Sequence, residues 1–214
     1  DTRTSFDGGT GKFRWSEGDN IAIHMSTGYF TEAEVDYRTG FFECPTTESR
    51  YRNYYAVYPA SIAVEDAYGN PDLDVVLPAT YDISEKLTTD YSPLPMIAVN
   101  REAESDLYFN HAGGLIRIIL NDVAAEAAQA RVTFEHNVTG TFRVHWASEK
   151  LPYISDGGDG AVVTFQLAES TLGEVTNGIR LNVPVPTGHY GEVKVEVLNT
   201  GGAALSTIVS DIDW

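Results

Sequence analysis

Histidine side chains are the groups of this chain best suited to general-base catalysis or metal binding, because an imidazole changes its protonation near neutral pH. Their spacing fits neither role, since no pair shows the HExxH pattern, and no serine lies in a nucleophile elbow. A catalytic triad assembled from residues distant in sequence stays open, but the sequence favours no enzyme and predicts no catalytic residue. We expect His111 to be a hydrogen-bonded residue in a strand bend and His145 to point into solvent. The five histidines are His24, His111, His136, His145 and His189.

Acidic side chains are the second group that could bind a metal ion or catalyse a reaction. The segment 156–160 alternates aspartate with glycine and could present oxygens to calcium, but it lacks the bidentate glutamate of an EF-hand loop, so a flexible hairpin loop is favoured. Asp82, Glu85 and Asp90 cluster loosely, whereas glycoside hydrolysis needs two facing carboxylates about 5–10 Å apart.

The single cysteine, Cys44, excludes an internal disulfide and a thiolate cluster, and we expect a buried, inert thiol. No metal and no cofactor are expected.

The charge of the chain limits its partners. It has 14 lysines and arginines against 31 aspartates and glutamates, a formal net charge of −17 over 214 residues. Such a surface repels phosphate backbones and anionic lipid headgroups, which argues against nucleic-acid binding and membrane docking. The sequence shows neither a transmembrane run of about 18 apolar residues nor a signal peptide, so we expect the chain as given to be soluble.

Apolar residues recur with a period of two along most of the chain, which is typical of half-buried strands. Phe142, Val144 and Trp146 alternate with polar residues, for example. Glycine-rich turn signals separate the strands, and only residues 122–130 have a helical composition, enough for a turn or two. The pattern predicts an all-β protein with little helix, folded as one or two β-sandwiches. Further strands are expected near 29–37, 41–44, 54–58, 73–77, 95–99, 107–120, 131–136, 161–167, 181–185 and 193–197.

Three short motifs follow one another in a fixed order. In the first, Trp15 and Ile21 are expected to point inward, with Gly18 and Asp19 forming the turn between them. The second is the tyrosine-rich strand 54–58, which Pro59 ends. The third is the strand 107–120. The motif residues that we expect to be structural are Trp15, Gly18, Asp19, Tyr55, Tyr58, Pro59, Phe109 and His111.

In this order the motifs resemble the fimbrillin-like family, the Mfa-like and FimA-like pilins and adhesins of Bacteroides-type bacteria. The resemblance implies stacked Greek-key, transthyretin-like β-sandwiches. The polar run 100–106 then suggests an N-terminal lobe at 1–104 and a C-terminal lobe at 105–214, with a single domain as the alternative.

The resemblance also implies a function. Such a protein is a non-catalytic fimbrial subunit or adhesin at the cell surface, held on the outer membrane as a lipoprotein by a lipidated cysteine upstream of this chain. Its partners are other fimbrial subunits, and host proteins or glycans. Subunits of the family join by strand exchange, often after proteolysis near the N-terminus, for which Arg3 is the candidate.

A carbohydrate-binding module of a surface lipoprotein is the alternative. Aromatic rings that lie exposed in a row can stack on sugar rings, whereas strand exchange needs an open sheet edge. The candidate stacking residues are Tyr29, Tyr51, Tyr54, Tyr58 and Trp146.

Overall fold

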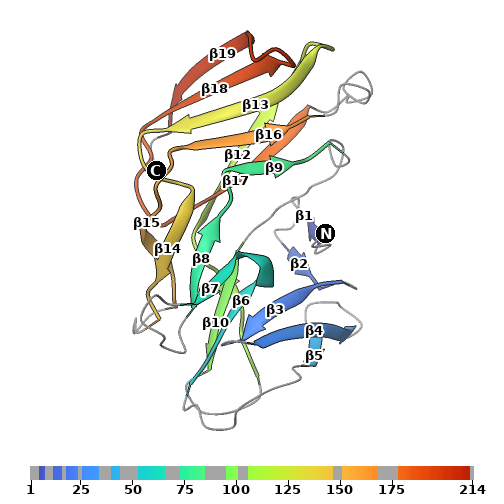
Figure 1. The fold of residues 1–214 in the computed structure, drawn as a ribbon, viewed down its shortest axis with the longest axis vertical. Coiled ribbons are helices and arrows are strands. Elements are labelled where there is room, and N and C mark those ends of the chain that lie inside the picture. Colours follow the sequence, from blue (N-terminus) through green and yellow to red (C-terminus); the bar gives the residue numbers. More distant parts are fainter. Residues whose placement is uncertain are drawn as a thin grey trace.

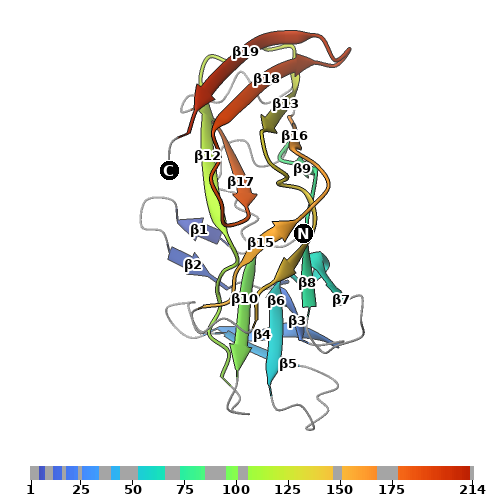
Figure 2. The same cartoon turned by 90° about the vertical axis from the view of Figure 1, so that its left-hand side faces the viewer.

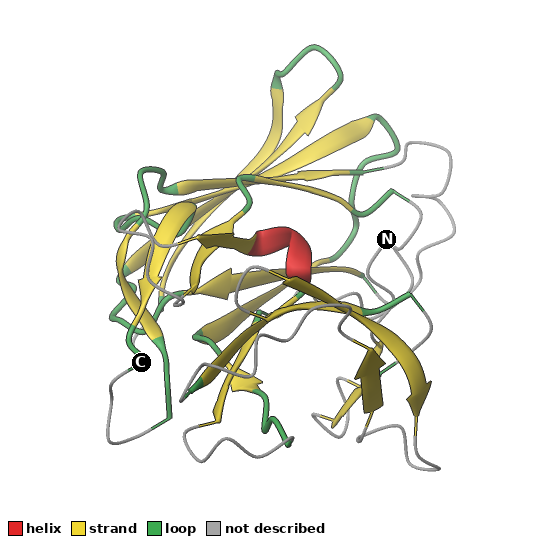
Figure 3. Ribbon diagram, turned by 60° about the horizontal axis from the view of Figure 1, so that its bottom comes forward, coloured by secondary structure: helices red, strands yellow, loops and turns green. Residues whose placement is uncertain are grey.

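The protein is all-β, as the sequence predicted. A computed structural model contains nineteen strands and one short 3-10 turn, Ala60–Ile62, among the residues that it describes (Figures 1 and 3). The predicted helical turns at 122–130 are wrong in part: residues 125–126 form a turn, but Ala127 already begins a strand. Ala127 and Ala130 are fully buried there, so packing overrides alanine's helix preference. The described residues are 5–7, 12–15, 18–23, 26–33, 40–43, 53–65, 73–84, 95–100, 106–146, 151–167 and 178–212.

Two sheets make up the lower part of the molecule in Figure 1. A core that includes Val57, Val75, Ile97 and Phe142 takes side chains from both sheets. The six-stranded sheet has the order β11 (Asn110–His111), β10 (Met96–Asn100), β6 (Tyr54–Tyr58), β3 (Asn20–Ile23), β4 (Ser26–Ala33) and β5 (Gly40–Glu43). The four-stranded sheet has the order β15 (Ile154–Gly157), β14 (Gly140–Val144), β8 (Leu73–Leu77) and β7 (Ala63–Glu65).

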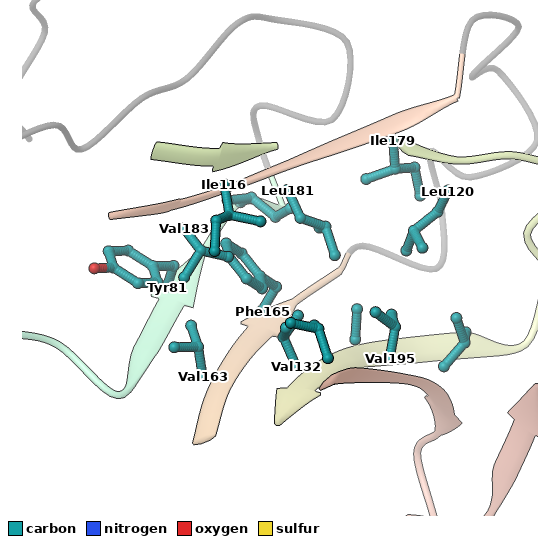
Figure 4. Close-up of a cluster of buried hydrophobic side chains, with 14 of the residues drawn as sticks. Tyr81, Ile116, Leu120, Val132, Val163, Phe165, Ile179, Leu181, Val183 and Val195 are labelled. Atoms are coloured by element: carbon teal, nitrogen blue, oxygen red, sulfur yellow. The ribbon is translucent and has the colours of Figure 1, made fainter. Parts of the chain in front are cut away.

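Two further sheets make up the upper part. Their shared core includes Val132 and Phe165 from one sheet and Ile116, Leu181 and Val183 from the other (Figure 4). The five-stranded sheet has the order β19 (Ala204–Asp211), β18 (Glu192–Asn199), β13 (Ala127–Phe134), β16 (Val162–Gln166) and β9 (Thr80–Asp82), and β12 (Gly114–Leu120) pairs with β17 (Ile179–Val185). A separate hairpin joins β1 (Ser5–Asp7) to β2 (Lys12–Arg14).

The chain passes repeatedly between these two parts. It changes from one to the other at the β8–β9, β9–β10, β11–β12, β13–β14 and β15–β16 connections. Strands β14 and β15 therefore join the sheet of β7 and β8, while β9 joins the sheet of β13 and β16. The lobes 1–104 and 105–214 stay a prediction, and strands pair across the point that would divide them.

The period-two pattern of β6 is confirmed. Tyr55 and Val57 belong to the core between the lower sheets, while Ala56 and Tyr58 lie in clusters on the opposite face. Two cores thus depend on one strand, because successive side chains of a strand point to opposite faces.

The predicted continuous strand 107–120 is interrupted. Residues 106–109 are not a strand, β11 covers only Asn110–His111, and a bend at 112–113 precedes β12. Gly113 lies so close to the end of β17 that an added Cβ would overlap the carbonyl oxygen of Val185. The chain turns here from the lower sheets to the upper ones.

Candidate functional site

The three sequence motifs meet in one aromatic cluster of the lower part. Trp15 is buried and makes edge-on ring contacts with Phe42, Tyr58 and Phe109, at centroid distances of 5.0, 5.0 and 5.4 Å. The hydroxyl of Tyr58 donates a buried hydrogen bond of 2.8 Å to Oδ1 of Asp19. Edge-to-face rings with a satisfied polar contact form a tightly specified core, so these residues have a structural role.

The remaining motif residues also lie at structural positions. Gly18 has a φ of +91°, as expected of the turn between Trp15 and β3, and Pro59 is buried directly after β6. Tyr55 contacts Trp146 edge-on at 5.0 Å. His111 lies in β11 opposite Met96; the residue is exposed as a whole, but desolvation of part of its ring lowers its pKa below the usual value. Desolvation favours the neutral imidazole.

An aromatic platform for sugars is not present at two of its five predicted positions. Tyr58 is 3% exposed and Trp146 is 5% exposed, and the Trp146 indole donates a hydrogen bond to the Leu73 carbonyl oxygen. The prediction of glycan stacking is wrong for these two residues, because their rings pack in the core. Tyr54 is half-buried against the cluster around Ala98.

Seven of the residues singled out in the sequence lie wholly or in part outside the described residues. Tyr29 belongs to β4, but its side chain lies outside the described part of the structure. The residues outside it altogether are Arg3, His24, Cys44, Tyr51, Glu85 and Asp90.

A polar cleft of about 390 Å³ opens where the β13–β14 connection, β15 and the β17–β18 connection meet. Most of its lining residues are exposed, but Tyr190 is buried and donates a hydrogen bond of 2.8 Å to the Pro186 carbonyl oxygen. Burial raises the pKa of Tyr190 to about 12, so its hydroxyl stays protonated. The lining residues are His136, Asn137, Ser155, Asp156, Gly157, Thr187, Gly188, His189 and Tyr190.

One serine–histidine contact lies beside this cleft, and no pattern in the sequence indicated it. Nε2 of His145 is 2.9 Å from Oγ of Ser155 and 3.5 Å from Oδ2 of Asp156. In a serine hydrolase the carboxylate contacts the other ring nitrogen, so this arrangement is not a triad. His145 is half-buried and stacks on Tyr153 at 4.7 Å, which corrects the prediction of a fully solvated side chain.

The glycine-rich segment 156–160 is held by hydrogen bonds to the β13–β14 connection. The carbonyl oxygen of Gly158 accepts one from Asn137, and that of Gly160 accepts two from the backbone at Val138 and Thr139. These two oxygens therefore face protein donors. Across the described residues, no three histidine, cysteine or acidic side chains gather closely enough to hold a metal ion.

Among the strands whose burial the structure describes, β19 forms the most exposed sheet edge. Strand β19 pairs with β18 and, within the described residues, with no other strand (Figure 2). All eight of its residues are exposed, including Ile208 at 59% and Val209 at 52%. Its exposed backbone edge and apolar side chains fit the addition of a further strand. The sequence did not predict β19, because Leu205, Ile208 and Val209 do not alternate with a period of two.

Comparisons with known proteins identify no relative. No protein-family model matches the chain, and neither the curated proteins nor the solved structures that were compared contain a match. Among the described residues, no helix has the length and apolar character needed to cross a membrane.

Proposed function

We propose that this chain is a non-catalytic fimbrial subunit or fimbrillin-like adhesin that joins its partners by β-strand addition. Its paired layers would be Greek-key β-sandwiches of the transthyretin-like type. The protein would act at the cell surface, on the outer membrane as a lipoprotein, with other fimbrial subunits and host proteins or glycans as partners.

The single observation that supports this function most is the exposed edge of β19. An added strand gains backbone hydrogen bonds along such an edge, and side-chain complementarity on both faces gives specificity. Stable monomers usually protect long edges with charges, proline or a covering segment. Strand β19 contains no lysine, arginine or proline.

The residues named by the motifs support a structural role as well. Trp15, Asp19 and Tyr58 are buried in the aromatic cluster, where no substrate reaches them. In the contact between His145 and Ser155, the described carboxylate of Asp156 lies against Nε2, the same ring nitrogen that contacts the serine. Neither group has the geometry of a nucleophilic active site.

Peptide binding tests the proposal. Synthetic peptides that cover the terminal strands of fimbrial subunits would be added to the full chain, with scrambled peptides as controls. A cognate peptide should raise the free energy of unfolding by about 2.7 kcal/mol at a hundredfold excess over its Kd. Ile208→Lys should remove this stabilisation, while Ile119→Lys, a change at an exposed isoleucine of β12, should leave it intact.

Adhesion and turnover assays complete the test. The same protein would be screened on host proteins, on a glycan array and against a broad set of hydrolase substrates. Binding to glycans alone, without any strand peptide, would favour the carbohydrate-binding module. Reproducible turnover without peptide binding or adhesion would replace the proposal with an enzyme.

A further inference from the structure

We propose that β19 pairs with β19 of a second copy of this chain, antiparallel about a two-fold axis at Ile208. The two five-stranded sheets would then form one continuous sheet. This inference rests on the proposed function in that the same edge receives the partner strand, and it names that partner as the chain itself.

The edge of β19 differs from the other edges of the three larger sheets. The strands at those edges are β5, β7, β9, β11 and β15, and each spans two to four of the described residues. In the two-stranded sheet of β12 and β17, β12 contains Arg117, and β17 contains Arg180 and Pro184, residues that discourage edge pairing. The strands of the other two-stranded sheet, β1 and β2, have three described residues each. Strand β19 has eight residues and one charge, Asp211 at its end.

Symmetry and sheet geometry fix which registers are open to such a pair. A two-fold axis that relates antiparallel neighbours is perpendicular to the sheet, so each paired residue must point to the same face as its partner. Because side chains alternate between the two faces of a strand, two paired residues must be an even number of positions apart in the sequence. The axis therefore passes beside one residue, which pairs with its own copy. The β18–β19 register shifts between Val197 and Leu198, beside Leu205, so the regular part of β19 begins at Ser206.

Centring the axis on Ile208 uses this regular part and gives matched neighbours. Ile208 faces Ile208 of the second copy, Thr207 faces Val209, and Ser206 faces Ser210. Within residues 206–210, each cross-strand pair joins side chains of like character: apolar with apolar, β-branched with β-branched, hydroxyl with hydroxyl. The next position sets Asp211 opposite Leu205, where the regular part of β19 has ended. Ile208 is also the most exposed large apolar residue of the strand.

The charge of β19 does not oppose this register. The two copies of Asp211 would stand six residue steps apart along the strands, about 20 Å at a rise of 3.4 Å per residue. Exposed charges at that separation are screened when the Debye length is about 8 Å. The net charge of −17 on each chain still repels the second copy at long range, so added salt should strengthen the pairing.

Sedimentation equilibrium of the full chain at 50 and 500 mM NaCl tests this pairing. The expected result is a monomer–dimer equilibrium that shifts towards the dimer at the higher salt concentration. Ile208→Lys places two ammonium groups opposite each other at the axis and should raise the dimer Kd at least about tenfold. Ile119→Lys is the matched control, because Ile119 is 51% exposed on another strand, and it should dimerise like the wild type.

Disulfide trapping tests the register in a Cys44→Ser background. Ile208→Cys should form an inter-chain disulfide under mild oxidation, because directly opposed Cα atoms lie about 4.5–5.5 Å apart. Thr207→Cys should crosslink far more slowly, since its two copies would lie two residue steps apart along the strands and about 5 Å apart across them. The diagonal Cα distance is then about 8 Å, beyond the roughly 7 Å that a disulfide spans.

A chain that stays monomeric in both salt concentrations, or a dimer lost in Ile119→Lys but kept in Ile208→Lys, would overturn the self-pairing. Faster crosslinking of Thr207→Cys than of Ile208→Cys would overturn the register. If the monomeric chain still binds strand peptides from fimbrial subunits, only the self-pairing fails and the proposed function stands. If the chain dimerises through β19 but no such peptide binds the monomer at protein concentrations well below the dimer Kd, the proposed function fails alone.

Discussion

Gly18 connects Trp15 to β3 with a backbone φ of +91°, a conformation that non-glycine residues rarely adopt. A Cβ added there would have no neighbouring atom within 4 Å, so space does not limit this position. Its only constraint is the backbone conformation. The position therefore isolates one physical cause, the cost of positive φ.

Gly18→Ala should lower the free energy of unfolding by about 1 kcal/mol or more, because the alanine Cβ is strained at positive φ. Urea denaturation followed by circular dichroism measures the change. Gly201→Ala is the control, since Gly201 lacks the positive φ and an added Cβ would approach only a side-chain oxygen of Asn199 at 3.4 Å. Equal stability of Gly18→Ala and wild type would show that the turn tolerates a side chain.

Tyr190 should make stability depend on alkaline pH. Its folded-state pKa is raised to about 12 by burial, above the ordinary value of 10.0. The stabilisation is fully present below pH 10, where both folded and unfolded states are protonated. It is lost as the pH rises from 10 to about 12, because the unfolded chain releases this proton first.

The stability advantage of the wild type over Tyr190→Phe should therefore shrink by on the order of 1–3 kcal/mol between pH 10 and 12. Urea denaturation of both proteins across that range measures the difference. Titrating groups elsewhere affect both proteins equally and cancel. Parallel stability curves would show that the Tyr190 hydroxyl is solvated in the folded state.

Among the elements, the bend between β11 and β12 is a point of close backbone approach. Gly113 faces the carbonyl group of Val185 in β17, while Gly114 faces only a methyl group of the same residue at 3.3 Å from an added Cβ. A backbone atom cannot move aside as a side chain can. Two adjacent glycines thus differ in what a side chain would displace.

Gly113→Ala should destabilise the protein by about 1–3 kcal/mol, the usual cost of overpacking. Gly114→Ala should cost less, because the Val185 side chain can shift by a few tenths of an ångström. Thermal and urea denaturation of the two variants give the comparison. A larger loss in Gly114→Ala would contradict the close approach of this bend to β17.

At the scale of the whole molecule, the two parts should unfold together. Phe142 and Ile154 lie in the lower core, on strands that follow the upper strands β12 and β13 in the chain. The amide of Ile154 donates to Ala112, and the carbonyl oxygen of Ile154 accepts from Thr187, which follows β17. Unfolding of either core therefore disorders strands that the other core needs and breaks hydrogen bonds to it.

We expect one cooperative transition and a far-ultraviolet spectrum dominated by β-structure. In a Trp214→Phe background, fluorescence of Trp15 and Trp146 reports on the lower part, and hydrogen exchange of the β13 and β18 amides reports on the upper part. The two midpoints in urea should coincide. Two separated midpoints would mean that the parts are independent folding units.

Local sequence patterns were enough to predict the β-class of the protein and the position of many strands. Period-two alternation, as in β14 and β18, is a local property, because a strand's own side chains alternate between two faces. The turn at Gly18 could also be predicted from the sequence, because the tolerance of positive φ is a property of a single glycine residue.

Which faces and edges are covered became clear from the folded protein alone. Tyr58 and Trp146 look like surface aromatics until their neighbours fold over them, and Ser155 meets His145 only when β14 and β15 pair. Strand β19 is exposed because it lies at the end of its sheet, and no local pattern encodes that place. The burial of a side chain and the position of a strand in its sheet depend on contacts with segments that are distant in sequence. Local periodicity carries no information about those contacts.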